Sequence, residues 1–243
     1  MLDGREVWCQ GFSEPGSGSD LASLSTFAER DGDEWVVNGQ KVWTSEAQYA
    51  DFCILVARTD REVAKHKGLS YFLLDMKSPG VTVRPLRQLT GESEFNELFL
   101  DQVRIPGDRL LGGEGNGWQV ALTTLTFERS QIGMAYAIRV RTLLTALMDH
   151  LSSTGRISDP LVADRFADIE IRTRFLELPS QRLLSEAEAK GGMGPEGSLT
   201  KWMWSDTNAR LAELAVDVAG PDALLQGSRW SYALLRSRAN SIE

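Results

Sequence analysis

Hydrophobic and polar residues follow two different patterns along the chain, and the pattern changes near Gly112. Before that residue, short apolar runs alternate with turn-forming residues, which is typical of β-strands. After it, apolar residues recur three and four positions apart, which is the spacing of α-helices. The two patterns predict a β domain over residues 1–112 and a helical domain over residues 113–243.

Seven apolar runs in the first region are predicted to be strands. They are Arg5–Phe12, Glu34–Val37, Phe52–Ala57, Leu69–Met76, Val81–Val83, Phe95–Phe99 and Gln102–Ile105, the last two forming a pair. Asp31-Gly32 and Asn38-Gly39 favour type I′ hairpin turns on either side of the second run. Ser78–Gly80 predicts another turn. Short strands without a helical period predict a small antiparallel barrel or sandwich.

The second region contains four long segments with helical spacing. They are Trp118–Leu151, Pro160–Ala189, Ser198–Ala219 and Pro221–Ala239, with a glycine-containing loop at Gly191–Gly197. Short connections place consecutive helices antiparallel. The chain is therefore predicted to be an α+β multidomain protein, in which a small β-barrel or sandwich is followed by an antiparallel four-helix bundle.

Composition narrows the class of protein. The 243 residues are 42% hydrophobic and 25% charged, with a net charge of −8, which fits a globular protein of one or two domains. Nucleic-acid binding is not expected, because the charges are interspersed and form no basic face. No apolar run reaches about 18 residues and no signal peptide is recognised, so we expect no membrane span and a cytoplasmic location.

Cysteine and histidine are too sparse to predict a metal site. Cys9 and Cys53 each lie among apolar residues, which favours buried free thiols over a disulfide. His66 and His150 stand at unrelated places in the sequence, so no metal-binding cluster is expected.

A polar loop is predicted at Ser13–Asp20, after the first strand. Gly16 and Gly18 allow a tight turn and a close approach to a ligand, since they carry no Cβ. The serine hydroxyls and backbone N–H groups can bind an anion or a carbonyl. The loop lacks the third glycine of a dinucleotide fingerprint and the Lys-Ser/Thr ending of a P-loop. Its residues alone leave two interpretations open, a ligand-binding loop or an ordinary Gly/Ser turn.

A second motif, Asn38–Ser45, follows about two dozen residues later. Together the two motifs resemble the acyl-CoA dehydrogenase family, closely from about Trp8 to Gln131 and loosely afterwards. The resemblance implies a fold with an N-terminal helical domain, a central β domain and a C-terminal four-helix bundle. Only the last two correspond to this chain, so we expect a fragment or a truncated subunit.

The resemblance also implies a cofactor, FAD, and an activity, dehydrogenation of the Cα–Cβ bond of an acyl-CoA thioester. The residues that match flavin contacts of the family are Phe12, Ser13, Gly18, Trp43, Thr44 and Ser45. Ser19 matches a residue that contacts the thioester ligand. Taken alone, Trp43 is equally typical of an aromatic residue in a barrel core.

Glu128 is the candidate catalytic base. It lies on one helical stripe with the apolar residues Ala121, Leu125, Ile132 and Ala135. Burial there would raise the pKa of its carboxyl group, as a base working near neutral pH requires. The residues alone favour a structural glutamate paired with an arginine of another helix.

The resemblance favours the catalytic role, because some relatives carry their base in a context like Phe127-Glu128-Arg129. Other relatives carry it beyond the end of this chain, and Glu243 falls one residue early for that position. By the same resemblance, Phe127 and Arg129 are expected to bind the acyl-CoA, Arg129 at its CoA part.

Two departures from the family pattern concern assembly. Ser153–Pro160 stands where homotetrameric relatives have Arg-x-x-Phe-Gly, and Ala219–Asp222 stands where they have Gly-Gly-x-Gly. A homo- or hetero-oligomer, dimer or tetramer, is expected. In a hetero-oligomer, the other subunit would lend the lost contacts, as the resemblance to paired bacterial acyl-CoA dehydrogenase subunits that act on steroid side chains implies.

Three functions remain in view. The first is a catalytic subunit passing electrons to an electron-transfer flavoprotein. The second is a non-catalytic or half-site subunit of a hetero-oligomer, and an oxygen-using oxidase is a weaker third.

Overall fold

The computed structural model describes residues 3–190, 197–225 and 227–242, without the side chains of 129–132, 183–184, 186–190 and 197. The chain divides into two compact units, Met1–Thr124 and Leu125–Glu243. The division falls inside the first long helix, so the boundary expected near Gly112 stays a prediction. Each unit is described by itself below.

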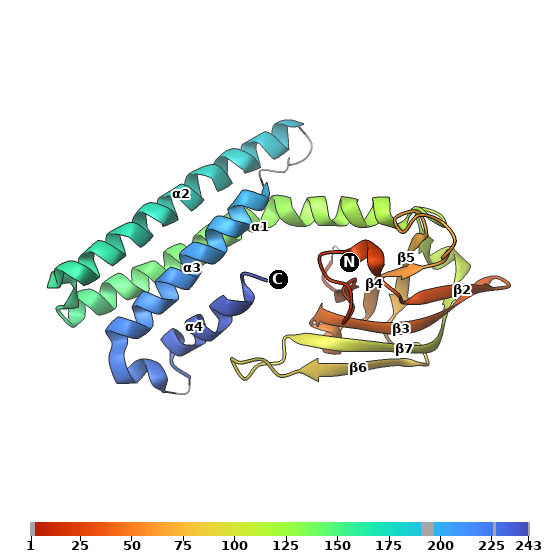
Figure 1. The fold of residues 1–243 in the computed structure, drawn as a ribbon, viewed down its shortest axis with the longest axis horizontal. Helices are drawn as coiled ribbons and strands as arrows, with labels where there is room; N and C mark the ends of the chain where they lie inside the picture. Colours follow the sequence, from red (N-terminus) through yellow and green to blue (C-terminus); the bar gives the residue numbers. More distant parts are fainter. Residues whose placement is uncertain (1–2, 191–196, 226, 243) are drawn as a thin grey trace. The chain divides into compact units, whose positions relative to one another are not determined.

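The first unit is built on one eight-stranded sheet (Figure 1). Its strands are β1 Trp8–Gly11, β2 Phe27–Asp31, β3 Glu34–Ser45, β4 Phe52–Arg58, β5 Leu69–Asp75, β6 Val81–Leu86, β7 Phe95–Pro106 and β8 Leu110–Leu111. They are ordered β6-β7-β3-β2-β4-β5-β8, and β1 pairs with β4. Most neighbours are antiparallel, as predicted, and the short strands β2 and β8 were not anticipated.

Two pairings are parallel, so the sheet is mixed rather than wholly antiparallel. β1 pairs with β4 from Trp8↔Phe52 to Gly11↔Leu55, and β2 pairs with β4 through Phe27↔Arg58. Since β5 occupies the other edge of β4, β1 and β2 lie one after the other along a single edge. The polar segment between them therefore leaves the sheet and returns to the same strand.

One predicted hairpin turn is correct in place and the other is wrong. Asp31 pairs with Glu34 across a two-residue turn in which Gly32 has φ 62°. Its second residue, Asp33, is not left-handed, so the turn is not type I′. Gly39 instead lies inside β3, at a shift in the β3–β7 register. A Cβ there would come within 2.4 Å of Thr26 Oγ1, so this glycine permits a close backbone approach.

The predicted pair of strands at the end of the first region is one strand, β7. The apparent break coincides with Gln102, which has φ 52°. Asn38 Oδ1 accepts hydrogen bonds from the backbone N–H and the side-chain amide of Gln102, at 2.8 and 2.9 Å. The irregularities of β3 and β7 thus stabilise each other, and neither strand turns back.

The core of the first unit is formed by the inward residues of these strands. Trp35 and Val37 of β3, Leu55 of β4 and Phe72 of β5 are almost fully buried, with Trp35 edge-on to Phe72. Cys9 and Cys53 belong to the same core as free thiols.

The second unit is a bundle whose consecutive helices run in opposite directions (Figure 1). Its helices are the part of α1 Gly117–Ser153 from Leu125 onwards, α2 Pro160–Lys190, α3 Gly197–Ala219 and α4 Arg229–Ala239. α4 is shorter than predicted because Gly220–Leu224 forms a 3₁₀ turn and Ser228 caps a new helix by accepting from Trp230 N–H. Most of the predicted loop at Gly191–Gly197 lies outside the described residues.

The bundle core starts at Ala137 of α1 and follows the stripe through Val140, Leu144, Leu147 and Leu151. Ion pairs link the helices around it. Arg141 of α1 contacts Glu170 and Glu177 of α2, at 2.5 and 2.7 Å. Among the residues that the structure describes, no helix is long and apolar enough to span a membrane.

Candidate functional site

The polar loop after β1 is held in shape by its own backbone and one serine. Glu14 and Ser17 exchange two backbone hydrogen bonds of 2.8 and 3.0 Å. The Ser17 hydroxyl is buried and donates to the carbonyl of Asp20, at 2.7 Å. Gly16 and Gly18 are exposed, and a Cβ on either would meet no atom within 4 Å. The outer side of the loop therefore has room for a ligand.

A buried ion pair joins this loop to the second motif. Lys41 of β3 is 0% exposed, and its ammonium group lies 2.8 Å from Glu14 Oε1. The same ammonium donates to the carbonyl of Phe12, at 3.0 Å. Val42 N–H also donates to the carbonyl of Ser13, at 2.9 Å. The two motifs that the sequence singles out are thus neighbours in the folded strand unit.

Glu14 is saturated with hydrogen bonds inside the protein. Besides Lys41, its carboxylate accepts from Ser25 N–H and Oγ–H, both at 2.7 Å, and from Thr26 N–H at 2.9 Å. Burial acts to raise the pKa of Glu14, but Lys41 and the other donors lower it to about 2. Glu14 is therefore ionised at neutral pH and is occupied by the protein, not by a ligand.

Trp43 is held in an unusual conformation at the edge of the same site. Its φ is 60°, in the left-handed region that bulky residues rarely adopt. The indole is 60% exposed, and the edge contact with Phe95 has a ring-centroid distance of 5.9 Å. Such strain persists only where the surroundings impose it, and it concentrates at functional sites. The alternative that Trp43 is an ordinary core residue is wrong.

Thr44 and Ser45 point in opposite directions. The side chain of Thr44 is fully buried, and its Oγ1 has no hydrogen-bond partner among the described residues. Ser45 is exposed. The cofactor contact of Thr44 and Ser45 stays a prediction, and burial of the Thr44 side chain leaves its main-chain atoms for that contact, because successive residues of a strand face opposite sides. Ser45 is the one whose hydroxyl can meet a ligand.

The remaining predicted contacts of the strand unit divide in the same way. Phe12 is buried and packs edge-on against Tyr71, so only its backbone can contact a ligand. The hydroxyls of Ser13, Ser19 and Ser45 make no hydrogen bond among the described residues. An exposed indole beside uncommitted hydroxyls can hold a flat aromatic ring that carries polar atoms on its edge.

Glu128 and Phe127 lie in the helical unit, on α1, and both are exposed. The prediction that Glu128 is buried in an apolar stripe is wrong for this chain by itself. Sixteen residues separate it from the core residue Leu144, so the two side chains point about 160° apart on the helix. The side chain of Arg129 lies outside the described residues.

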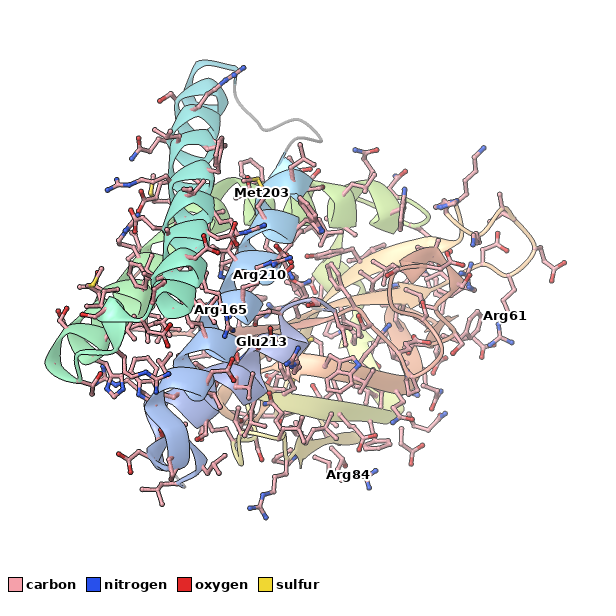
Figure 2. The ribbon with its side chains drawn as sticks, turned by 60° about the vertical axis from the view of Figure 1, so that its left-hand side comes forward. Arg61, Arg84, Arg165, Met203, Arg210 and Glu213 are labelled. Atoms are coloured by element: carbon pink, nitrogen blue, oxygen red, sulfur yellow. The ribbon has the colours of Figure 1, made fainter. Side chains whose placement is uncertain are left out.

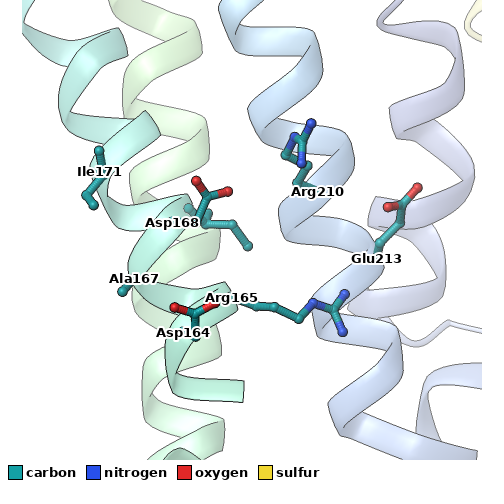
Figure 3. A pocket seen from close by; sticks show the side chains of 8 residues that line it. Asp164, Arg165, Ala167, Asp168, Ile171, Arg210 and Glu213 are labelled. Atoms are coloured by element: carbon teal, nitrogen blue, oxygen red, sulfur yellow. The ribbon is translucent and has the colours of Figure 1, made fainter. Parts of the chain in front are cut away.

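The helical unit has a hollow of about 490 Å³ on its surface, between α2 and α3. Its lining is mainly charged, and Arg165, Arg210 and Glu213 gather there (Figures 2 and 3). Arg165 reaches across to Asp217 of α3, at 2.8 Å, and Arg210 contacts Asp206. These charges are neutralised by structural partners, and none of the predicted site residues lines the hollow.

The sequence interpretation did not single out Glu14 and Lys41, although both lie inside the motifs. One signal was available for Lys41. Trp35 and Val37 set the inward face of β3, and the alternation places Lys41 on that same face. A charged residue at an inward position requires a buried partner.

Two family models match nearly the whole chain. "Acyl-CoA dehydrogenase, middle domain" matches residues 9–103. "Acyl-CoA dehydrogenase, C-terminal domain" matches residues 115–243.

Individual relatives and solved structures also match the chain along nearly its whole length. The chain is 40% identical to acyl-CoA dehydrogenase IpdE1 of Mycobacterium tuberculosis over its full length, and it spans 63% of that protein. Its fold matches a structure titled "Tcur3481-Tcur3483 steroid ACAD", with a TM-score of 0.91, 26% identity and coverage of 99% of this chain and 64% of that one. The ChsE4-ChsE5 complex of Mycobacterium tuberculosis matches with a TM-score of 0.86, 28% identity and coverage of 97% and 64%.

Proposed function

Because this chain belongs to the acyl-CoA dehydrogenase family, we propose that it carries the flavin-facing loops and the catalytic base of a dehydrogenase acting on acyl-CoA thioesters. The observation that carries the proposal is the strained, exposed Trp43 near the end of β3, a strand joined to the Ser13–Asp20 loop by the Glu14–Lys41 pair. That arrangement spends conformational energy to present an aromatic face and several hydroxyls.

Members of this family are FAD-dependent flavoproteins, and the residues of the strand unit fit such a ring. The indole of Trp43 would lie beside the flavin, and the hydroxyls of Ser13 and Ser45 would hydrogen bond to its polar edge. The open space at Gly18 would allow close approach to the backbone. Phe12 and Thr44 would contribute only main-chain atoms.

The base is proposed to be Glu128. FAD, when bound, supplies a hydride acceptor at its N5. Glu128 would take the α proton, and the electron pair of that C–H bond would form the Cα=Cβ double bond as the β hydrogen leaves as hydride. Since Glu128 is exposed in this chain, a bound thioester would have to cover the carboxylate to raise its pKa. Two electrons then pass to a carrier, proposed to be an electron-transfer flavoprotein.

The substrate is proposed to be a fatty-acyl or steroid side-chain thioester. Ser19 and Phe127 would contact the acyl thioester, and Arg129 would contact its CoA part. The likeness to a protein described as a steroid ACAD supports the steroid class.

The test is the colour of the purified protein. We expect a flavin spectrum that bleaches when an acyl-CoA is added without an electron acceptor. Glu128→Gln should keep the flavin and slow bleaching by about 10²-fold or more. Asp149→Asn, an exposed carboxylate on the same helix, is the matched control and should bleach at the wild-type rate. Normal bleaching by Glu128→Gln would remove Glu128 from the role of base.

A second candidate is a subunit of a hetero-oligomer in which another chain completes the site. It is supported by the two structural matches whose titles name two proteins each. We expect mass spectrometry of the complex purified from its own cell to show two chain types. A single chain type that binds FAD in full occupancy would reject this candidate.

A further inference from the structure

We infer that the buried Glu14–Lys41 pair is a positioning device that fixes the flavin-facing backbone of the Ser13–Asp20 loop and of the end of β3. The inference rests on the proposed function and names residues that would not touch the flavin themselves. Both side chains are at most 5% exposed, and they bind each other and the backbone of Phe12, Ser25 and Thr26.

Lys41 sits where β3 departs from regular pairing. Its backbone still pairs in register with Leu98 of β7, and the register then shifts before Thr44. Trp43 lies within that shift, in its left-handed conformation. The ammonium group of Lys41 therefore fixes the last regularly paired residue before Trp43. Its hydrogen bond to the Phe12 carbonyl also fixes the start of the Ser13–Asp20 loop.

Glu14 closes the first loop into a ring. Its backbone pairs with Ser17, and its carboxylate reaches Ser25 and Thr26 just before β2 begins. The beginning and the end of residues 13–26 are thus bound to one side chain. The exposed residues between them, including Ser19, are carried on a closed loop whose ends cannot separate.

Stability alone is a poor reason for such a pair. Replacing a buried ion pair by apolar residues of similar volume is often neutral or stabilising, whereas removing one partner is strongly destabilising. An apolar pair, however, has no donor for the Phe12 carbonyl and no acceptor for the N–H groups of Ser25 and Thr26. Stability and loop geometry can therefore be separated by experiment.

The experiment uses the full chain and the double variant Glu14→Leu/Lys41→Met. The single variants Lys41→Met and Glu14→Gln accompany it. Arg104→Met is the matched control, because Arg104 forms exposed pairs with Asp31 and Glu34 in the same unit. Three quantities are measured: the thermal midpoint, the affinity for FAD by flavin fluorescence, and hydrogen–deuterium exchange of residues 13–26.

We expect the double variant to recover the part of the midpoint that Lys41→Met loses through the uncompensated charge of Glu14. Its FAD binding should remain about tenfold or more weaker than wild type, since small misplacements of binding groups are costly. Hydrogen–deuterium exchange of residues 13–26 should be faster, and exchange of the strands should be unchanged. Arg104→Met should match wild type in FAD affinity and in exchange.

Wild-type FAD affinity and wild-type exchange in the double variant would overturn the inference. If the double variant does not fold, the same result in Glu14→Gln would overturn it. If the wild-type chain binds no FAD alone or in its native complex, the proposed function fails. The exchange of residues 13–26 then decides the inference by itself, and unchanged exchange in the variants rejects it.

Discussion

The two units use charge in opposite ways. In the strand unit, Lys41 is completely buried against Glu14, and the pair holds backbone groups of a loop. In the helical unit, Arg141 is 30% exposed, and it connects α1 to α2 beside a cluster of buried apolar side chains. The first arrangement controls where a loop lies, whereas the second sets which helices are neighbours. The buried pair of the strand unit thus positions a loop, and the partly exposed pairs of the helical unit join two helices.

The largest change in stability is expected for Lys41→Met. It leaves the Glu14 carboxylate buried without a cation, so the free energy of unfolding should fall by about 3–5 kcal/mol. Urea denaturation followed by circular dichroism measures it. The control Arg104→Met should leave the free energy of unfolding close to that of wild type, since its pairs are exposed. Equal losses from the two variants would show that burial of the first pair does not matter.

Acid is the next test, through Glu14. Its pKa is about 2 in the folded state against an ordinary value of 4.5, so the folded state binds the proton less readily than the unfolded one. The resulting stability, on the order of 3 kcal/mol, is fully present above about pH 4.5 and is lost as the pH falls towards 2. Glu14→Gln should flatten this part of the pH profile of urea midpoints. A profile as steep as that of wild type would assign the acid sensitivity to other carboxylates.

Arg141→Met should have a smaller effect than Lys41→Met. Hydrogen bonds to Glu177 and then Glu170 raise the pKa of Arg141 above its usual range, but both carboxylates keep access to water once the arginine is gone. Glu170 also retains Arg174 as a partner, at 3.0 Å. We expect a loss of about 1–2 kcal/mol in the free energy of unfolding. A loss as large as that of Lys41→Met would erase the contrast between the units.

The smallest expected change comes from Trp43→Gly. Glycine adopts the left-handed conformation without strain, so the free energy of unfolding should stay within about 1 kcal/mol of wild type while FAD binding weakens. Trp202→Gly is the matched control, because Trp202 is also exposed but lies inside α3. There the substitution should cost about 1 kcal/mol or more. A larger loss at Trp43 would show that its indole supports the core.

The type and approximate place of most strands and all four helices could be predicted because each carries its own period, whereas the short strands β2 and β8 were missed. Residue-level contacts between distant segments could not. Asn38-Gly39 looks like a turn because its residue types are turn formers, and only Gln102, more than sixty residues away, shows that it is a bulge. The parallel pairing of β1 and β2 with β4 likewise depends on which edge is vacant.

The candidate site was predictable in its motifs and not in its side-chain directions. The alternation of inward and outward residues in β3 shifts between Lys41 and Thr44, so Thr44 points inward and Ser45 points outward. For Glu128, the apolar stripe of Ala121, Leu125, Ile132 and Ala135 suggested burial, but the bundle packs through the different stripe that starts at Ala137. A helical stripe shows that residues share a face and does not show what that face meets.

In the closed loop after β1, some residues hold the shape of the loop and others face outward, where a ligand can bind. Glu14 and Ser17 face the protein and keep the loop closed, so substitutions there change the architecture. Ser19 and the neighbouring glycines face outward and have no structural partner among the described residues, so substitutions there change only what is recognised. New ligand preferences can evolve at the outer positions of this loop while the inner positions keep its shape constant.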